Sequence, residues 1–370
     1  MPHALCSGIE GQGVHMKNRT GRFRAFREDG RRCRQLHCRL PFRRRLSILS
    51  PCRRLPFFRL PAAGFTLLFC LSTAGCMLFG PDNERVLVMT YNLHNLFDDE
   101  CTGTEYSEFC PETAEWNTVA YHARLEDFGR VIRGVRGTYG HGPDVVVLTE
   151  VENVHVVEEL RDRVLGQRRY PVALASAMPD SAIQVGLLSR FPARDVRLHG
   201  IYPVDGKRVR PILEVRLQLG DQESPKDMFL FAAHWPSKIG GEAETESLRL
   251  QAANVIARRI QQITADHPEA AVLVAGDLNQ TLPEEASSCR SDFDFDQDLE
   301  SLPPARSLMA VCPQLMPYYP EPERPLFVTR NLYAAAADPQ VLFSPWGITD
   351  FPGSYVYGNE WERIDHFLLG

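Results

Sequence analysis

Apolar runs of strand length that finish on polar residues are the dominant pattern between residues 85 and 370. The runs are 86–92, 144–150, 228–234, 271–279 and 363–370. The polar residues at or near their ends are Asn92, Glu150, His234, Asp277, Asn279, Asp365 and His366. An unpaired buried carboxylate costs free energy, so a buried strand has no structural reason to end on one. The repeated pattern therefore predicts that these strand ends meet in one functional site.

The run 271–279, Ala-Val-Leu-Val-Ala-Gly-Asp-Leu-Asn, is the most informative of the five. Side chains two residues apart in a strand point to the same face, so Asp277 and Asn279 are expected to converge at a sheet edge. Gly-Asp-Leu-Asn is a weak signal by itself, because the same residues favour turns. The four other strand ends with polar residues favour the functional interpretation.

Helical spacing of apolar residues predicts helices between these strands. Leu125, Phe128, Ile132 and Val135 follow one another at spacings of 3, 4 and 3, and a similar stripe runs through 242–263. A shorter helix is expected over about 154–165. Further strands are expected near 172–176, 183–189 and 212–218, and the Pro-rich residues 281–345 are expected to be irregular. This alternation predicts an α/β protein.

The side chains at the strand ends fit one kind of chemistry. Carboxylate and amide oxygens are the ligands that a Mg²⁺-like ion prefers, and imidazoles transfer protons near neutral pH. Hydrolysis of a phosphodiester needs charge neutralisation on the phosphoryl oxygens, an activated water and a protonated leaving oxygen. The predicted site contains groups for all three.

Five motifs occur in a specific order along residues 85–370. They are Asn95-Leu-Phe-Asp98, Trp116 with Tyr121 and Arg124-Leu125, the segment 143–153, the segment 234–241, and Gly276-Asp-Leu-Asn279. In this order the motifs resemble the endonuclease/exonuclease/phosphatase superfamily, which is deoxyribonuclease I-like, and most closely its bacterial extracytoplasmic branch. The resemblance implies a four-layer α/β/β/α sandwich with the active site at one end of two packed sheets.

The resemblance also implies roles for individual residues. Asn92, Glu150 and Asp365 are expected to bind the metal, Mg²⁺ first, with Mn²⁺ or Ca²⁺ also suitable. Asp277 and Asn279 are expected to orient the phosphate and activate water, and His234 and His366 to be the catalytic histidines.

Four more residues receive expected roles or surroundings, of which the role of Arg210 is implied by the resemblance. Arg210 is expected to contact the substrate phosphate, although Arg208 is close enough to take that place, and Lys238 is a further candidate phosphate contact. Asp350 is a candidate to orient His366. Asp98, followed by two more acids, is interpreted as part of a solvated acidic loop.

The sequence departs from the family pattern near its end. The last family motif is usually Ser-Asp-His, and Ile364 stands here in place of its Ser. Gln280 stands where this branch often has Asp. The sequence stops four residues after His366. The last strand is therefore expected to be short, or the reading frame to be truncated.

Charge separates the N-terminal segment from the rest. Residues 1–75 hold 15 Lys and Arg against 3 Asp and Glu, whereas residues 76–370 hold 26 basic and 44 acidic residues, a net charge of −18. Residues 1–52 are Arg-rich without a periodic apolar pattern. They are interpreted as unstructured or as a start assigned upstream of the real one, with a basic nucleic-acid-binding arm as the alternative.

Residues 53–75 read as a signal peptide. Two arginines precede the apolar run 60–71, and small residues precede Cys76. This pattern predicts lipidation of Cys76, a tether over 76–84 and one domain over 85–370. The expected location is the cell envelope, as an exported lipoprotein; plain secretion and a retained anchor are the alternatives.

Four cysteines follow Cys76, namely Cys101, Cys110, Cys289 and Cys312. An even number in an exported domain suggests disulfides, Cys101 with Cys110 and Cys289 with Cys312. Free thiols are the alternative. No Cys-x-x-Cys spacing occurs, which argues against a zinc site.

The expected function is a Mg²⁺-dependent phosphodiesterase, most favourably a nuclease that acts as a monomer. DNA or RNA is favoured over phospholipid as substrate, although a net charge of −18 argues against tight non-specific nucleic-acid binding. The alternatives are a phospholipid or small-molecule phosphodiesterase or phosphatase, similar to sphingomyelinases, and a non-catalytic surface-binding lipoprotein on the same scaffold.

Overall fold

The computed structural model describes residues 3–5 and 86–370, except 111–114, 136–141, 180, 203–208, 221–224, 283–303, 313–315 and 320–323. The described residues from Leu87 onward belong to one compact unit. The predictions for the basic segment, the signal peptide and Cys76 concern residues outside the described ranges. No helix in the described ranges is long and apolar enough to cross a bilayer.

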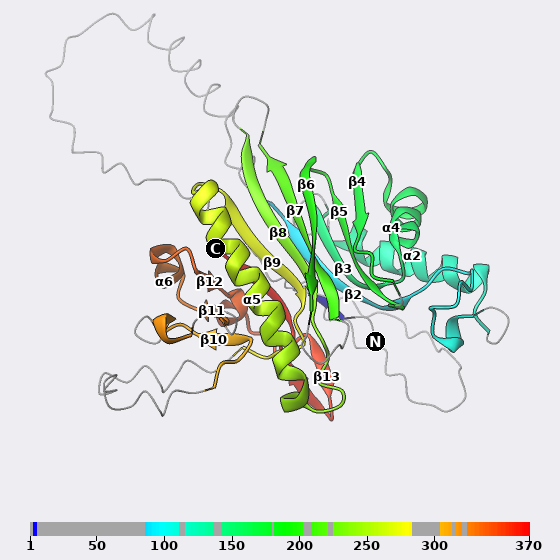
Figure 1. The fold of residues 1–370 in the computed structure, drawn as a ribbon. Coiled ribbons are helices and arrows are strands. Elements are labelled where there is room, and N and C mark those ends of the chain that lie inside the picture. The colour runs from blue at the N-terminus through cyan, green and yellow to red at the C-terminus, as the bar shows by residue number, and fades with distance from the viewer. Residues whose placement is uncertain are drawn as a thin grey trace, which may run out of the picture. The chain divides into compact units, whose positions relative to one another are not determined.

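Two sheets form the centre of the fold (Figure 1). The first has the order β1 (His3–Leu5), β2 (Val88–Leu96), β3 (Val145–Val151), β5 (Gln184–Ser189) and β4 (Val172–Ala175). The second has the order β10 (Leu308–Ala310), β11 (Leu326–Thr329), β12 (Val341–Phe343), β15 (Asp365–Leu369), β9 (Ala271–Asp277), β8 (Lys226–His234), β7 (Val209–Leu219) and β6 (Ala193–Ile201).

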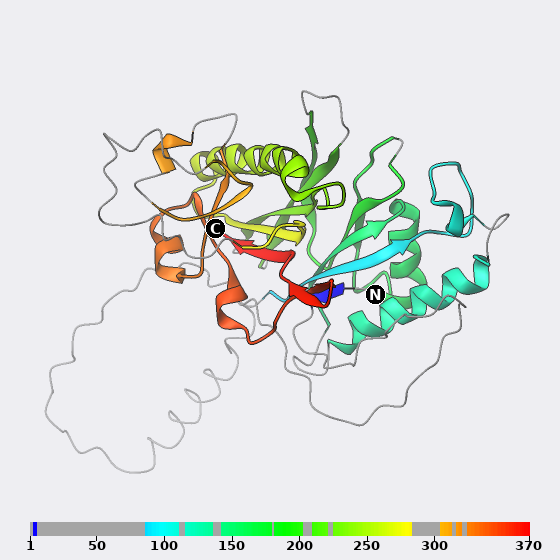
Figure 2. The same ribbon diagram turned by 90° about the horizontal axis from the view of Figure 1, so that it is seen from below.

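The two sheets pack against each other and helices cover their outer faces. Strands β2, β3 and β5 contact β7, β8 and β9 across the interface. Helix α2 (Thr118–Gly134) and α4 (Val154–Glu159), which continues as a π-helical turn over Leu160–Leu165, lie on the first sheet. Helix α5 (Glu242–Asp266) lies on the second, at the opposite side of the sandwich (Figures 1 and 2). The four-layer α/β/β/α architecture predicted from the sequence is confirmed.

The sequence explains why α2 forms and which face it buries. Asn117 caps the helix, because its side-chain oxygen accepts hydrogen bonds from the N–H groups of Val119 and Ala120. The apolar stripe that predicted the helix is buried against the first sheet. Gly129 permits close packing, since a Cβ there would lie 2.1 Å from Val164 Cγ1.

The prediction for residues 281–345 was wrong in part. The described residues of this segment include strands β10, β11 and β12 and helix α6 (Leu332–Ala337). These strands have only three or four residues, too few to show the alternation that identifies a strand. The charged edge strand β6 and the hairpin β13 (Tyr355–Tyr357) and β14 (Glu360–Glu362) were also not predicted.

Strand β15 is short, and it lies between β12 and β9 in the second sheet. Its register with β9 pairs Asp365 with Asp277 and His366 with Gly276. Strand β8 pairs with the other side of β9, which places His234 beside Asp277. Three of the polar strand ends therefore lie on adjacent strands of one sheet.

Candidate active site

Asn92 joins the two sheets at the site. Its side-chain Nδ2 donates hydrogen bonds to Glu150 Oε1 at 2.9 Å and to Asp277 Oδ2 at 3.2 Å. Asn92 and Glu150 come from β2 and β3 of the first sheet, and Asp277 ends β9 of the second. Asn92 and Asp277 are buried, whereas Glu150 is half-buried. The carboxylates of the two sheets thus face one another across a shared amide.

The backbone leaves the extended conformation at these strand ends. Glu150 has φ 60° and Asn279 φ 50°, and His94 and Asn95 also lie in the left-handed region. The ladder between β2 and β3 shifts register after Asn92. Left-handed conformations are unfavourable for such residues and persist only where the surroundings hold them. At Glu150 and Asn279 they interrupt the normal alternation of side chains along the strand, beside the site.

Arg124 holds one of these turns, a role the sequence did not predict. Its guanidinium donates to the carbonyl oxygens of Leu93, His94 and Asn95 at 2.8–3.0 Å. It also lies 5.6 Å from the ring centroid of Trp116. The family-like spacing of Trp116 and Arg124 was a signal, but only the fold reveals which carbonyl groups the arginine contacts.

Gly276 allows strands β8 and β9 to lie close together at the site. It has φ +134°, and a Cβ at this position would lie 2.0 Å from the carbonyl oxygen of Ala233. A side chain would therefore push apart the two strands that carry His234 and Asp277. The glycine of the Gly-Asp-Leu-Asn motif is required by this contact and by its positive φ.

Asp277 and Asp365 form a buried acidic pair. Burial, with a further contribution from Glu150, raises the pKa of Asp277, although the hydrogen bond from Asn279 N–H opposes this. Burial and the neighbouring Asp277 raise the pKa of Asp365 well above its ordinary value. The Ser354 hydroxyl, which accepts a hydrogen bond from the Asp365 N–H at 3.1 Å, opposes this rise, and the described residues supply no closer partner for the carboxylate oxygens of Asp365. A buried acid with so few partners calls for a cation.

The two histidines lie in different surroundings. Ligand atoms of His234, Glu150 and Asp277 lie within 4.8 Å of one another, and burial lowers the pKa of His234 well below its ordinary value. His366 is fully buried, its Nε2 lies 2.7 Å from the carbonyl oxygen of Gln280, and burial lowers its pKa to about 4. Both imidazoles are therefore neutral at pH 7.

Asp350 is not the partner of His366 that the sequence suggested. It is exposed, and within the described ranges no hydrogen bond joins it to His366, whose Nε2 lies against Gln280 instead. Because Asp365 and His366 are adjacent in β15, their side chains leave opposite faces of the strand. This alternation separates the environment of His366 from that of Asp365.

Arg210 provides the positive charge of the site. Its Nε donates to the carbonyl oxygen of His234 at 3.2 Å and its Nη2 to that of Trp235 at 3.3 Å. Burial lowers its pKa, while the nearby carboxylates of Glu150 and Asp277 oppose that effect. The alternative, Arg208, lies outside the described residues.

Asn279 and Lys238 are placed differently. Asn279 donates its Nδ2 to the carbonyl oxygen of Trp235 at 3.0 Å, and its backbone N–H to Asp277 Oδ1 at 2.9 Å. Lys238 Nζ lies 3.8 Å from Glu242 at the start of α5. Asn279 thus belongs to the cluster around Asp277, while the phosphate contact of Lys238 stays a prediction.

Asp98 is not part of a solvated loop, so that prediction was wrong. It is buried, its backbone N–H donates to Glu152 Oε2 at 2.7 Å, and its Oδ2 accepts from Asn153 Nδ2 at 3.3 Å. Burial raises the pKa of Glu152 to about 8, despite the opposing hydrogen bond from Asp98. A neutral Glu152 limits the charge repulsion between its carboxyl group and the buried Asp98.

Arg249 is a second residue that the sequence did not predict. It is fully buried on α5, where its Nη1 donates to the carbonyl oxygen of Pro236 at 3.2 Å and its Nη2 to Glu246 at 2.9 Å. The bond to Pro236 fixes the segment that follows His234. An arginine on the buried face of a helix indicates that nearby carbonyl or carboxylate oxygens accept hydrogen bonds from its guanidinium group.

The donor set fits a divalent cation. Glu150, Asp277 and Asp365 supply hard carboxylate oxygens, and Asp365 pairs with Asp277 across β15 and β9. The grouping of Glu150, His234 and Asp277 differs from the set expected from the resemblance, which was Asn92, Glu150 and Asp365. Glu150 is common to both sets. The cysteine cluster at Cys101 and Cys110 is disulfide-bonded and offers no thiolates.

Replacing Asp365 with Asn is expected to change how stability depends on pH in EDTA. The folded chain keeps a proton on Asp365 that the unfolded chain releases near pH 4. Stability therefore falls as pH rises toward the raised pKa. As pH rises above about 4, the melting temperature should therefore fall less steeply in Asp365→Asn than in wild type. The two histidines, with lowered pKa values, reduce stability only below about pH 6.5.

Thermal melts over a pH series from about 5 to 9, with and without Mg²⁺, measure this difference. Mg²⁺ should flatten the wild-type slope, because a bound cation compensates the charge, and should have little effect on the slope of Asp365→Asn. Identical slopes for the two proteins would contradict the raised pKa.

Comparison with known proteins identifies the family. A model described as the Endonuclease/Exonuclease/phosphatase family matches residues 87–301, more than half of the chain. The chain belongs to this family. Enzymes of the family hydrolyse phosphoester bonds and typically use divalent metals. No curated protein matches the sequence.

Solved structures give weaker likenesses. TDP2 from Caenorhabditis elegans is 16% identical over 59% of this chain and 55% of its own, with a TM-score of 0.37. The human Nocturnin catalytic domain with bound sulfate anion is 13% identical over 77% of this chain and 82% of its own, with a TM-score of 0.40. The chain spans about half the length of the first solved structures that it matches. Structural similarities with TM-scores this low do not support conclusions about this chain.

Proposed function

We propose that the chain is a divalent-metal-dependent phosphodiesterase, most favourably a nuclease, that is exported and tethered to a membrane. The observation that carries the proposal is the meeting of Asn92, Glu150, Asp277 and Asp365 beside Arg210. Three acids and one half-buried arginine, drawn from both sheets, match the needs of a phosphodiester that must be bound and attacked by water. We expect the enzyme to act as a monomer.

The cation site is assigned by ligand chemistry. Glu150 and Asp365 would hold Mg²⁺ or Mn²⁺, with Asp277 completing the oxygen ligands. Asn92 would join them only after its amide turned over, because its Nδ2 faces the carboxylates and its Oδ1 accepts from the His94 N–H at 2.8 Å. The bound cation would neutralise charge on the phosphoryl oxygens. Arg210, fixed by two carbonyl groups, would bind another phosphoryl oxygen and orient the phosphate.

The proton transfers are assigned by pKa and position. Asp277 has a raised pKa, which makes it a better base for a water proton than an ordinary carboxylate. Asn279 holds this carboxylate through its backbone N–H. His234 is neutral and lies with Glu150 and Asp277, where a ring N–H can donate to the phosphoryl or leaving oxygen. His366 would support this arrangement through its contact with Gln280.

A substrate panel tests the proposal. The purified full chain, freed of metal with EDTA, is assayed with added Mg²⁺, Mn²⁺ or Ca²⁺ on double- and single-stranded DNA, RNA, sphingomyelin vesicles and bis(p-nitrophenyl) phosphate. We expect hydrolysis only with metal, and faster hydrolysis of nucleic acid than of sphingomyelin. Preference for the lipid would favour the phospholipid alternative. Binding without hydrolysis of any substrate would favour the binding-protein alternative.

The membrane tether is proposed from the sequence around Cys76. An apolar run and small residues precede this cysteine. We expect the mature N-terminus to be Cys76 carrying a lipid. Mass spectrometry of the protein isolated from membranes measures this mass, and Cys76→Ser should release the protein into the soluble fraction. A peptide that reads through Gly75-Cys76-Met77 without modification would contradict the prediction.

A further inference from the structure

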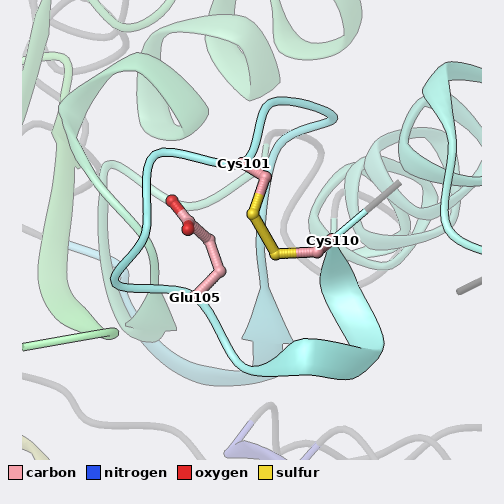
Figure 3. Close-up of side chains that lie close together, drawn as sticks. All are labelled: Cys101, Glu105 and Cys110. Carbon is pink, nitrogen blue, oxygen red and sulfur yellow. A yellow bond between two sulfur atoms is a disulfide. The ribbon is translucent and has the colours of Figure 1, made fainter. Parts of the chain in front are cut away.

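A disulfide closes a small loop between β2 and α2. Cys101 and Cys110 are bonded, nine residues apart in the sequence, and the Glu105 side chain lies inside the ring that they close (Figure 3). The Glu105 carboxylate accepts hydrogen bonds from the N–H groups of Thr102 at 3.0 Å and Gly103 at 2.7 Å. One covalent bond and one hydrogen-bonded carboxylate therefore fix the conformation of this loop.

Phe109 packs this loop against the body of the protein. Its ring stacks on that of Phe97 with centroids 4.7 Å apart and meets the ring of Trp116 edge-on at 5.2 Å. Phe97 is fully buried and directly follows β2, the strand that carries Asn92. Phe109 immediately precedes Cys110, and a closed loop has fewer conformations than an open one. The disulfide therefore limits the positions that the Phe109 ring can take.

The same ring lies against the Arg124 guanidinium. Arg124 Cζ is 5.9 Å from the ring centroid of Phe109. The ring centroids of Trp116 and Phe128 lie 5.6 and 5.2 Å from the same atom. Aromatic rings within about 6 Å of a guanidinium attract it. The three rings therefore hold the guanidinium in place while its N–H groups remain available for carbonyl oxygens.

Arg124 connects this cluster of rings to the turn that follows Asn92. Its three hydrogen bonds to the carbonyl oxygens of residues 93–95 hold a turn whose backbone is left-handed at His94 and Asn95. In this turn the His94 N–H donates to Asn92 Oδ1 at 2.8 Å. The Asn92 amide is thereby oriented with its Nδ2 toward the carboxylates of both sheets. The contacts are thus continuous from the disulfide to the candidate active site.

We propose that the disulfide of this loop positions the active site, through Phe109, Arg124 and the turn after Asn92. The inference rests on the proposed phosphodiesterase function. The chain is active while the loop is closed and loses activity when a dithiol opens it. The dithiol supplies two electrons and two protons: the S–S bond breaks, two thiols form, and the dithiol is oxidised to its own disulfide. Phe109 then loses its fixed position, and the hold of Arg124 on the turn weakens.

Opening the loop should act on the turnover rate and on the metal. Removing a group that orients a metal ligand typically costs about 10- to 100-fold in activity or metal affinity. Asn92 is such a group for Glu150, to which its amide donates. Cys101→Ser/Cys110→Ser should therefore lower kcat on bis(p-nitrophenyl) phosphate about 10- to 100-fold and raise the Mg²⁺ concentration needed for half-maximal activity. KM should change little, because the substrate itself loses no contact.

Phe109→Leu tests the route from the loop to the site. Leucine keeps an apolar side chain against Phe97 but has no ring for Arg124, so this variant should lower kcat as the double-serine variant does. The two changes combined should lower kcat no further than the larger of them alone, because effects that act through one contact are not additive. Glu108→Gln changes an exposed neighbour in the same helical turn and should leave kcat within about 2-fold of wild type.

Dithiothreitol tests the redox dependence. Cys312 is disulfide-bonded as well, so a dithiol acts on more than one bond, and its effect must be compared between wild type and the double-serine variant. It should lower the kcat of wild type to that of the double-serine variant and leave the variant unchanged. Equal losses in both proteins would trace the effect to the disulfide of Cys312 and would overturn the redox dependence.

Hydrogen–deuterium exchange of the full chain in EDTA measures the structural link without turnover. Peptides that cover residues 93–97 should exchange faster in the double-serine variant and in Phe109→Leu, because the turn opens more often, while peptides of β9 and α5 keep wild-type protection. If no phosphodiester is hydrolysed with any metal, the proposed function fails, and the exchange still decides the role of the loop.

Three outcomes would overturn the proposal. The first is wild-type kcat and wild-type exchange in the double-serine variant. The second is additive losses when this variant is combined with Phe109→Leu, since independent effects would exclude the route through the Phe109 ring. The third is faster exchange throughout β9 and α5 as well as in residues 93–97, because the variants would then be destabilised as a whole.

Discussion

Glu150→Gln is expected to lower kcat by about 100-fold or more while the protein stays folded. Loss of one group that stabilises transition-state charge typically costs about 100- to 1,000-fold. Glu150 is half-buried and accepts one hydrogen bond from Asn92, which the amide oxygen of the substituted side chain can still accept. The exchange removes a charge with little change of shape, so the effect should fall on kcat and on the metal concentration needed for activity.

Glu152→Gln is the matched control for this experiment. Glu152 lies two residues away, and its pKa of about 8 makes it largely neutral at pH 7, so the amide replaces a neutral acid. Its rate should therefore stay within a few-fold of wild type. Titration of activity with Mg²⁺ and melting curves for both variants make the comparison. Full activity of Glu150→Gln, or of wild type in EDTA, would contradict metal binding at Glu150.

The sequence predicted the α/β alternation because its strand and helix signals were long, whereas the four-layer arrangement came from the resemblance. The apolar runs within β3, β8 and β9 and the stripe of α2 are typical of buried strands and of an amphipathic helix. Short strands such as β10 and β12 carry too few residues for a pattern to appear. Their pairing in the second sheet is decided by contacts with distant strands, which local sequence does not encode.

The site was predictable as a set of residues but not as a set of contacts. Polar strand ends identified Asn92, Glu150 and Asp277, which the structure joins through hydrogen bonds. The left-handed φ of Glu150 and the contacts of Arg124 depend on how distant segments meet. Local charge also misled the interpretation of Asp98. Three consecutive acids suggest an exposed loop, and the sequence does not show that the first of them is buried against distant residues.

Replacing His234 or His366 with Ala is expected to lower the turnover rate about 100- to 10,000-fold, the span usual for general acid–base groups. The two variants should differ in stability. His366 contacts the Gln280 carbonyl and is fully buried, so its loss leaves an unpaired acceptor and a cavity. A loss of one buried hydrogen bond costs about 1–3 kcal/mol, and the melting temperature should fall clearly. The Nδ1 atoms of both histidines lack a partner among the described residues, and only His366 has a ring hydrogen bond to a backbone carbonyl there, so less stability should be lost at His234.

Rates must therefore be expressed per folded molecule, with melting curves for every variant. His366→Asn offers a second variant, since its amide can still donate toward a carbonyl oxygen and tests whether the contact alone is needed. If His366→Asn recovers both stability and rate, His366 acts by positioning the segment after Asp277. If it recovers stability alone, His366 takes part in the proton transfers. If His234→Ala unfolds early and yet keeps wild-type turnover per folded molecule, His234 is a packing residue, and the acid–base assignment has to move to Asp277 and water alone.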